Sequence, residues 1–429
     1  MSEYASLTKR ELESEKADLE KKYRGFQQKN LALDMSRGKP GADQLNLSMG
    51  ILDCINSSQP CRAQDGTDCR NYGLLDGIPE AKALFAQLLE VNPTEIIVGG
   101  NSSLTMMYDT VARAYTHGVL HSEEPWCRQD KIRFLCPSPG YDRHFAICEH
   151  FGIEMIPIEM RSDGPDMDAV KRLVESDETV KGIWCVPKYS NPEGVTYSDA
   201  VVDRFAALKP KAPDFRIFWD NAYCVHDLGE TSDPLKNILE ACRKNGREDM
   251  VFLFASTSKI SFPGSGVAMM AASCDNVAFI KKQMAAQAIG PDKINQLRHV
   301  RYFGDIEGIR NHMKKHAAIL RPKFKAVTEG LEKELGGTGL AEWTQPNGGY
   351  FISLNTPDGC ARETVRLCGE AGVKLTPAGA TFPYGKDPRD RNIRIAPTYP
   401  PVGELKTAIE LLCLCVKLAG VERLLSEKK

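Results

Sequence analysis

From about residue 92 onward, short apolar runs alternate with segments of helical pattern. The runs predict strands at 95–98, 132–135, 153–158, 180–186, 216–219 and 250–254. This alternation predicts an α/β fold, in which a mostly parallel sheet is covered by helices on both faces. In such sheets the chemistry collects in loops beyond the carboxyl ends of the strands. The polar residues that follow these runs are therefore the first candidates for a functional site.

The length of 429 residues predicts two structural domains. We expect residues 1–60 to form an N-terminal helix and arm that contribute to the small domain and to the active-site loop. The helix is expected to have a capping box at Thr8 and Glu11 and to pack Leu12, Leu19 and Phe26 on the body. Residues 61–320 are expected to form a large domain, and residues 321–429 a smaller α+β domain. Long helices are predicted at 312–335 and at 402–418.

Charge and cysteine usage exclude several kinds of partner. The chain has 55 Lys and Arg against 57 Asp and Glu, a formal net charge of -2, so no basic field is present to hold nucleic acid or an anionic membrane. The 14 cysteines form no CxxC pair, and the charged N-terminus lacks the apolar stretch of an export signal. No HExxH spacing points to a metal. We expect a cytoplasmic protein with reduced cysteines and no metal site.

Three polar motifs follow predicted strands. They are Asn191-Pro-Glu-Gly194 after the fourth strand, Asp220 with Tyr223 after the fifth, and Ser256-Thr-Ser-Lys259 after the sixth. Each alone has an ordinary explanation, namely a turn, a helix N-cap and a structural lysine.

In this order and approximate spacing, the motifs resemble those of class I aminotransferases, which have fold type I and use pyridoxal 5'-phosphate (PLP). The resemblance spans about residues 30 to 400. Segments 36–40, 99–103, 256–259 and 290–299 resemble the aspartate aminotransferase subgroup related to the enzyme half of MocR-type regulators. The resemblance implies a homodimer with shared active sites.

The resemblance assigns roles around the cofactor ring. Lys259 would form the Schiff base, which is covalent catalysis by an amine, and would then move a proton. Asp220 would pair with the ring nitrogen and keep it cationic. Asn191 and Tyr223 would hydrogen-bond the phenolic oxygen. Tyr141 matches the aromatic side chain that stacks on the ring.

A phosphate site is expected where the first of these strands turns into a helix. Backbone N–H groups and the helix dipole converge there. The expected phosphate-binding residues are Gly100, Asn101, Ser102, Ser103, Ser256, Ser258 and, from the neighbouring subunit, Tyr72. The chain departs from many relatives in having Ser265 where an arginine would fall, which implies that more hydroxyls or a cation from elsewhere hold the phosphate.

The substrate residues come from both ends of the chain. Arg394, between two apolar residues of a predicted strand, matches the arginine that grips the substrate α-carboxylate, and Asn191 is expected beside it. Gly38 would let the N-terminal loop approach closely. A side-chain carboxylate needs a second cation, for which Arg37 and Arg143 are candidates, although either could be an ordinary surface arginine. Further candidates are Lys293 and Arg298.

We expect aspartate and 2-oxoglutarate as the substrate pair. Other donors (kynurenine, 2-aminoadipate or alanine) and a β-lyase reaction stay open, because one fold hosts many PLP reactions. A non-catalytic regulatory module is disfavoured, since only about thirty residues precede Leu33 and no basic helix-turn-helix is present.

Overall fold

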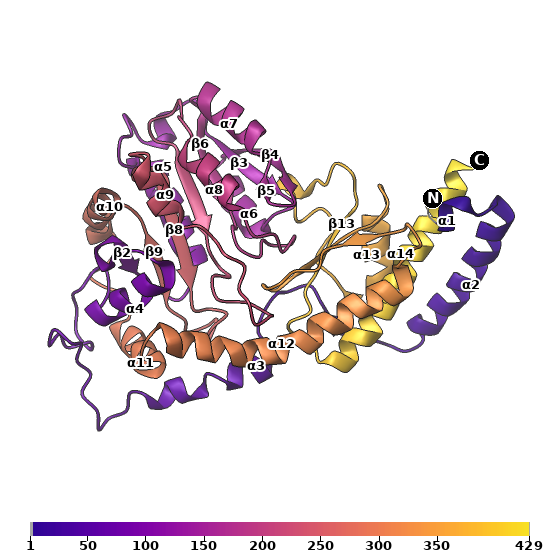
Figure 1. Cartoon of the computed structure of the whole chain (residues 1–429), viewed down its shortest axis with the longest axis horizontal. Coiled ribbons are helices and arrows are strands. Elements are labelled where there is room, and N and C mark those ends of the chain that lie inside the picture. The colour runs from indigo at the N-terminus through magenta and orange to yellow at the C-terminus, as the bar shows by residue number, and fades with distance from the viewer. Residues whose placement is uncertain (1–2, 429) are drawn as a thin grey trace.

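The computed structural model describes residues 3–428 and is built around an eight-stranded sheet (Figure 1). In spatial order the strands are β2 (Ile96–Val98), β9 (Ala268–Ala271), β8 (Val251–Ser256), β7 (Arg216–Asp220), β6 (Val180–Cys185), β3 (Arg133–Ser138), β4 (Glu154–Arg161) and β5 (Gly164–Pro165). The five strands from β8 to β4 pair in parallel. The six predicted strands are all present, and the predicted α/β class is confirmed.

The antiparallel strand β9 was not predicted. It lies between β8 and β2 and pairs with both in antiparallel orientation. Its sequence, Ala-Met-Met-Ala, lacks the β-branched and aromatic residues that favour strands. Because β9 pairs with β8, both ends of the loop between them, which contains Lys259, are fixed in the sheet.

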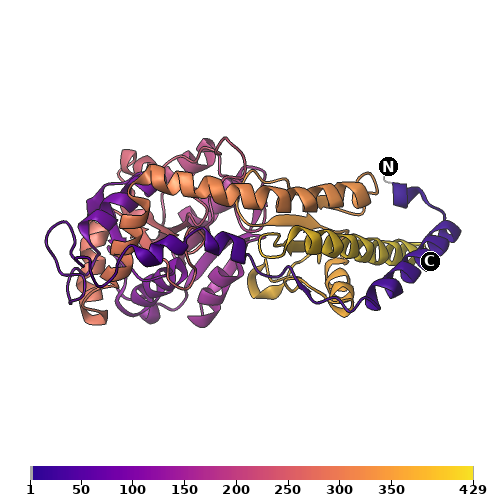
Figure 2. The same cartoon turned by 90° about the horizontal axis from the view of Figure 1, so that it is seen from below.

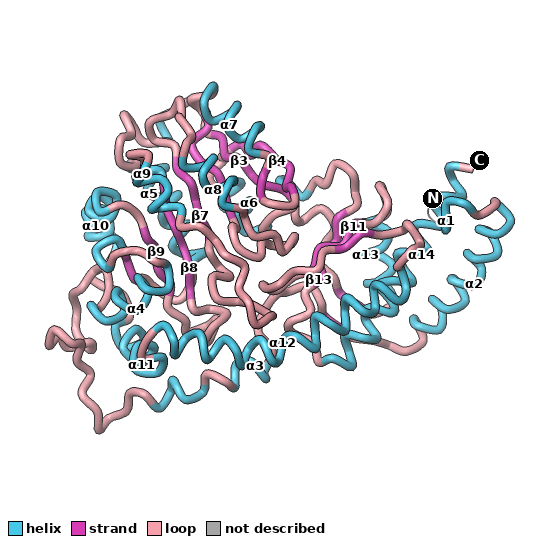
Figure 3. Tube along the Cα trace, in the orientation of Figure 1, coloured by secondary structure: helices cyan, strands magenta, loops and turns pink. Residues whose placement is uncertain are grey.

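Both faces of the sheet are covered, as the alternation of side chains shows. In β7, Ile217 and Trp219 pack into one hydrophobic cluster, whereas Phe218 between them packs into another. Figure 3 shows the strands between helices on either side. The helices connected with this sheet are α4 (Pro79–Leu89), α5 (Ser103–His117), α6 (Asp142–His150), α7 (Met167–Ser176), α8 (Asp199–Ala206), α9 (Ile238–Lys244), α10 (Cys274–Gln287) and α11 (Lys293–Phe303).

A third hydrophobic cluster belongs mainly to the two ends of the chain. Its elements are α1 (Glu3–Ser6), α2 (Lys9–Gln27), β1 (Leu33–Asp34), β10 (Glu342–Trp343), β11 (Ile352–Asn355), α13 (Ala361–Glu370), β12 (Val373–Lys374), β13 (Asn392–Ile395) and α14 (Val402–Glu427). The capping box at Thr8 is present, and Leu12 and Leu19 are buried. Because α2 packs against α14 and β1 pairs with β12, the N-terminal segment is part of this region.

The long helix α12 (Ile306–Leu335) runs between the two regions (Figure 2). It begins six residues before the predicted start, because the Asp305 side chain accepts a hydrogen bond from the Gly308 amide and caps it. Helix α14 also extends beyond its predicted end at residue 418. The short helix α3 (Ala42–Asn46) lies against α12. The domain boundary near residue 320 stays a prediction, since α12 passes through it without interruption. None of the helices among residues 3–428 has the length and apolarity that crossing a membrane requires.

Candidate active site

The residues predicted for the cofactor converge on one cavity of about 210 Å³. It is lined by side chains that follow the carboxyl ends of neighbouring strands, where the edge of a parallel sheet brings them together. Of the predicted residues, those lining it are Ser102, Ser103, Tyr141, Asn191, Asp220, Tyr223, Ser256, Ser258 and Lys259.

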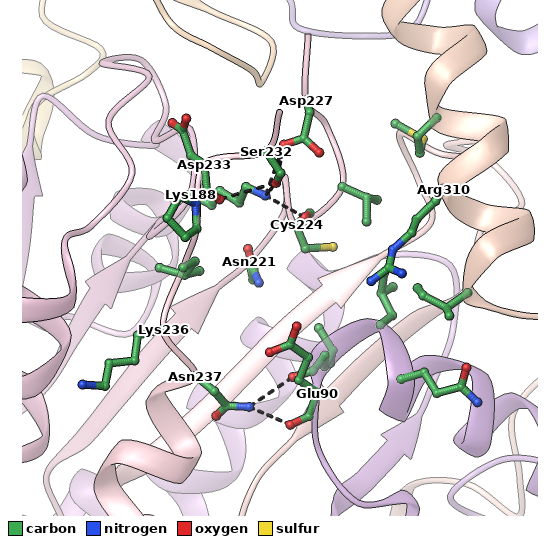
Figure 4. A pocket seen from close by; sticks show the side chains of 18 of the residues that line it. Glu90, Lys188, Asn221, Cys224, Asp227, Ser232, Asp233, Lys236, Asn237 and Arg310 are labelled. Carbon is green, nitrogen blue, oxygen red and sulfur yellow. Dashed lines mark hydrogen bonds and ion pairs between the residues drawn. The ribbon is translucent and has the colours of Figure 1, made fainter. Parts of the chain in front are cut away.

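A larger cavity, of about 920 Å³, is lined in part by the segment that follows β7 (Figure 4). Asn221 and Cys224 line it, whereas Asp220 and Tyr223 face the smaller cavity. The larger cavity also contains Lys188, whose amine already donates to the Ser232 hydroxyl and the Cys224 carbonyl. None of the predicted site residues lines it, so the smaller cavity is the candidate active site.

Lys259 has no carboxylate within ion-pair distance in the described part of the chain. Its ammonium nitrogen lies 4.9 Å from the ring centre of Tyr223 and 5.8 Å from that of Tyr350. Burial lowers the pKa of Lys259, Asp220 opposes that effect, and Arg394 adds to it. A larger share of this amine is therefore neutral, and nucleophilic, than for an ordinary lysine at the same pH.

Asp220 has one occupied and one free carboxylate oxygen. Oδ2 lies 3.0 Å from Nε2 of His144, and Oδ1 is buried without a hydrogen-bond partner. A buried, unpaired carboxylate oxygen is costly, and in a cavity it points to a missing donor. The protonated ring nitrogen of PLP is such a donor, so the residues present fit this cofactor.

His144 was missed by the sequence reasoning. It is buried in the first turn of α6, and its ring stacks on Trp184 with centroids 4.5 Å apart and planes 9° apart. This packing fixes the ring that holds Asp220. The signal was its position three residues after Tyr141 at a strand-to-helix turn, but the partnership depends on the spatial neighbourhood of β7.

The two tyrosines of the cavity are held in their neutral form. Burial raises the pKa of Tyr141 to about 12, with Asp220 and Asp142 adding to the effect. Burial also raises the pKa of Tyr223 well above its ordinary value. Both hydroxyls therefore keep their proton and can donate a hydrogen bond at neutral pH.

The expected phosphate site lies at the start of α5. Ser102 is the N-cap residue, yet its side chain forms no capping hydrogen bond. The Ser258 hydroxyl donates to the Asn101 carbonyl at 2.9 Å, and the Ser256 hydroxyl donates to that of Ser258 at 3.1 Å. The loop after β8 is thus tied to the Gly100–Ser103 turn, which gathers hydroxyls around the N–H groups of a helix N-terminus.

A cation from another helix reaches the turn that lacks the usual arginine. Arg298 of α11 donates to the Ser265 hydroxyl and, at 2.7 Å, to Asn295 Oδ1. Asn295 in turn donates to the Gly266 carbonyl. The structure thus has both a cation beside this turn and hydroxyls at the start of α5, and their role in holding the phosphate stays a prediction.

Lys293 does not fit a role as a substrate cation. It is buried, and its amine donates to the Gly73 carbonyl at 2.9 Å. It therefore supports the loop that carries Tyr72, a residue that is 79% exposed.

Arg394 lies in β13 and is 7% exposed. Its Nη1 donates to Asp142 Oδ1 at 2.8 Å and to Asn191 Oδ1 at 3.3 Å, and Phe351 lies 4.9 Å from the guanidinium carbon. The N-terminal loop comes close here, since a Cβ on Gly38 would lie 2.3 Å from Phe351 Cζ. Burial, aromatic stacking and hydrogen bonds thus hold the guanidinium beside the cavity.

The two other predicted arginines lie at the surface. The side chains of Arg37 and Arg143 are exposed, and within residues 3–428 neither forms an ion pair. Arg143 is nevertheless close enough to Tyr141 to lower that hydroxyl's pKa. Neither arginine lines the cavity of about 210 Å³, so a role of either in binding substrate stays a prediction.

Comparison with known proteins decides the family. The family model described as aspartate amino-transferase matches residues 7–428. The chain belongs to this family. It is 44% identical to the aspartate aminotransferase of Corynebacterium glutamicum over 94% of this chain and 93% of that protein. It is 47% identical to a putative aminotransferase of Mycolicibacterium smegmatis, over 99% of this chain and 100% of that protein.

Solved structures agree with this assignment. The structure of an aspartate transaminase from Corynebacterium glutamicum superposes with a TM-score of 0.96, at 42% identity and over 99% of both chains. The α-aminoadipate aminotransferase LysN of Thermus thermophilus shares the fold, with a TM-score of 0.71 at 19% identity over 92% and 93% of the chains. The expected fold type I is confirmed. Use of PLP is a general property of this family of aminotransferases.

The charges around Lys259 predict how its reactivity depends on pH. In cofactor-free protein, labelling of Lys259 by acetic anhydride should rise with pH through a midpoint below the ordinary 10.5. Arg394→Gln should move this midpoint to higher pH, because a cation near Lys259 is lost. Asp220→Asn should move it to lower pH, because an anion near Lys259 is lost. Peptide mass spectrometry gives the labelled fraction, with the exposed Lys325 as an internal reference. A midpoint at or above 10.5 would contradict this description of the site.

Proposed function

We propose that this protein is a PLP-dependent aminotransferase that moves an amino group between aspartate or glutamate and 2-oxoglutarate or oxaloacetate. The observation that carries the proposal is the meeting, at one cavity, of an unpaired lysine amine with a carboxylate whose second oxygen is buried and free. The 44% identity to an enzyme named aspartate aminotransferase supports the choice of substrate.

The bound cofactor would supply an electron sink for the pair left when the substrate Cα–H bond breaks. Asp220 Oδ1 would accept a hydrogen bond from the ring nitrogen and favour its protonated form, while His144 holds the other oxygen. Tyr223 and Asn191 would hydrogen-bond the phenolic oxygen. Tyr141 would cover one face of the ring and exclude water from it.

Lys259 would act twice through one nitrogen. Its Nζ would hold the cofactor through the aldehyde carbon, with the carbonyl oxygen lost as water, and once the substrate amine has replaced it there the freed Nζ would accept the proton from the substrate Cα and release it again. Both steps need a neutral amine. The lowered pKa of Lys259 supplies it at lower pH than an exposed lysine could.

The phosphate would be held by the start of α5 and the loop after β8. The residues proposed for this are Gly100, Asn101, Ser102, Ser103, Ser256 and Ser258. The exposed Tyr72 would reach the phosphate of a neighbouring subunit, so we also propose a homodimer with shared active sites. We further propose a cytoplasmic location and a division into residues 1–60, 61–320 and 321–429.

Arg394 would bind the substrate α-carboxylate, with Asn191 beside it. Gly38 would let the N-terminal loop approach the bound substrate closely. Arg143, two residues after Tyr141, or Arg37 would bind the side-chain carboxylate. Structural neighbours that act on kynurenine or α-aminoadipate are below 25% identical to this chain and show the fold alone, so they support no other substrate.

The purified protein, incubated with PLP, aspartate and 2-oxoglutarate, should form oxaloacetate and glutamate. A coupled assay for oxaloacetate measures the rate, and a panel containing kynurenine, 2-aminoadipate and alanine tests the choice of donor. Lys259→Ala should lose this activity, since no other lysine among residues 3–428 lines this cavity. Turnover of another donor in the absence of any reaction with aspartate would defeat the proposed substrate.

The choice between the two surface arginines can be made kinetically. Arg143→Gln should lower kcat/KM for aspartate by roughly 10- to 100-fold, the usual effect of losing a charged hydrogen bond, and change that for alanine little. Arg37→Gln, measured with the same two donors, tests the other candidate. An equal loss for both donors, or an effect confined to Arg37→Gln, would remove Arg143 from this role.

A further inference from the structure

We propose that Asp142 is a built-in competitor for Arg394, so that a substrate carboxylate must displace it in order to bind. Asp142 then sets the affinity for substrates and products without contributing to the chemical step. This inference rests on the proposed function of Arg394 and adds to it a residue that neither the sequence motifs nor the family assignment identifies.

The hydrogen bonds of Arg394 show the competition. A guanidinium Nη carries two hydrogens, and both of those on Nη1 have acceptors, Asp142 Oδ1 at 2.8 Å and Asn191 Oδ1 at 3.3 Å. Its Nε is 3.4 Å from the Thr376 hydroxyl, and Nη2 is the nitrogen left for a new acceptor. A substrate carboxylate that accepts hydrogen bonds from both Nη1 and Nη2 therefore has to replace one of the two present partners of Nη1.

Asp142 is the partner that can leave. It is the first residue of α6, and its side chain is 34% exposed, against 8% for that of Arg394. Within residues 3–428 the ion pair with Arg394 is the only one that Asp142 forms. When displaced it stays at a helix N-terminus, where the helix dipole favours a negative charge, with the exposed Arg143 as its neighbour. Asn191, by contrast, is 4% exposed and is fixed in the NPEG turn.

The exchange explains why such a pair is useful. A buried arginine without a counterion is costly and would attract any small anion. With Asp142 present, the charge of Arg394 is balanced when the site is empty, and binding exchanges one carboxylate for another. Product release is the same exchange in reverse, so the carboxylate product does not leave an uncompensated cation behind. The pair thus keeps Arg394 ordered and holds the affinity for carboxylates low.

A purely positioning role for Asp142 predicts the opposite change in carboxylate affinity when Asp142 is removed. If Asp142 merely positioned Arg394, its removal would loosen the guanidinium and weaken carboxylate binding. If it competes, removal strengthens binding. The substitution Asp142→Asn keeps the shape and removes the charge, and Asp142→Glu restores the charge.

The test is a spectral titration of the PLP-loaded enzyme with two unreactive ligands, maleate and propionate. Competition predicts that Asp142→Asn binds both about 3- to 10-fold more tightly, lowers KM for aspartate by a similar factor and makes the enzyme sensitive to chloride. Asp142→Glu should return all three quantities toward those of the unmodified enzyme. Unfolding temperature and cofactor absorbance check that each variant is folded and loaded.

Weaker or unchanged binding of both ligands by Asp142→Asn would overturn the inference and leave the proposed function standing. Arg394→Lys separates the two claims, because it should weaken both ligands at least 10-fold in either Asp142 background. If Arg394→Lys binds both ligands as the unmodified enzyme does, Arg394 is not the carboxylate site, and the proposed substrate site fails together with the inference.

Discussion

The site depends on a carboxylate that folding buries and leaves half satisfied. One oxygen of Asp220 is held by His144, whose ring is stacked on Trp184, and the other has no partner. A buried carboxylate oxygen without a hydrogen-bond donor lowers the free energy of unfolding. The protein without cofactor is therefore less stable than it would be if this oxygen had a partner. The cationic ring nitrogen of the proposed cofactor would satisfy this oxygen, and burial at the end of β7 would strengthen their interaction.

The remaining charges are arranged around this pair. Lys259 lies beside Tyr223 and has no ion-pair partner within residues 3–428, and burial lowers its pKa, so a larger share of its amine is neutral and reactive. Arg394 comes from the C-terminal region, and its charge favours the neutral form of Lys259 while Asp142 balances it from α6. Elements from both regions, connected by α12, therefore set the electrostatics of a single cavity. Movement of one region relative to the other would change the reactive amine and the carboxylate site together.

Much of this could be predicted from the sequence. The alternation of apolar runs predicted five of the parallel strands, and polar motifs directly after strands placed Asp220, Asn191 and Lys259 at one sheet edge. The antiparallel strand β9 escaped prediction because its composition is weak and its neighbours decide its conformation. His144 and Asp142 escaped for a related reason, and Arg298 was predicted only as a substrate cation and not as the partner of Ser265. Their partners, Asp220, Arg394 and Ser265, are distant in the sequence, and no local pattern records such pairings.

Reduction of the PLP-loaded protein with borohydride, followed by peptide mapping, tests the central claim most directly. The reduced cofactor should be found on the peptide that contains Lys259 and on no other, and Lys259→Ala should carry none. A label on Lys188, the buried lysine of the larger cavity, or on any other lysine would contradict the account, as would the absence of a covalent label from the loaded protein.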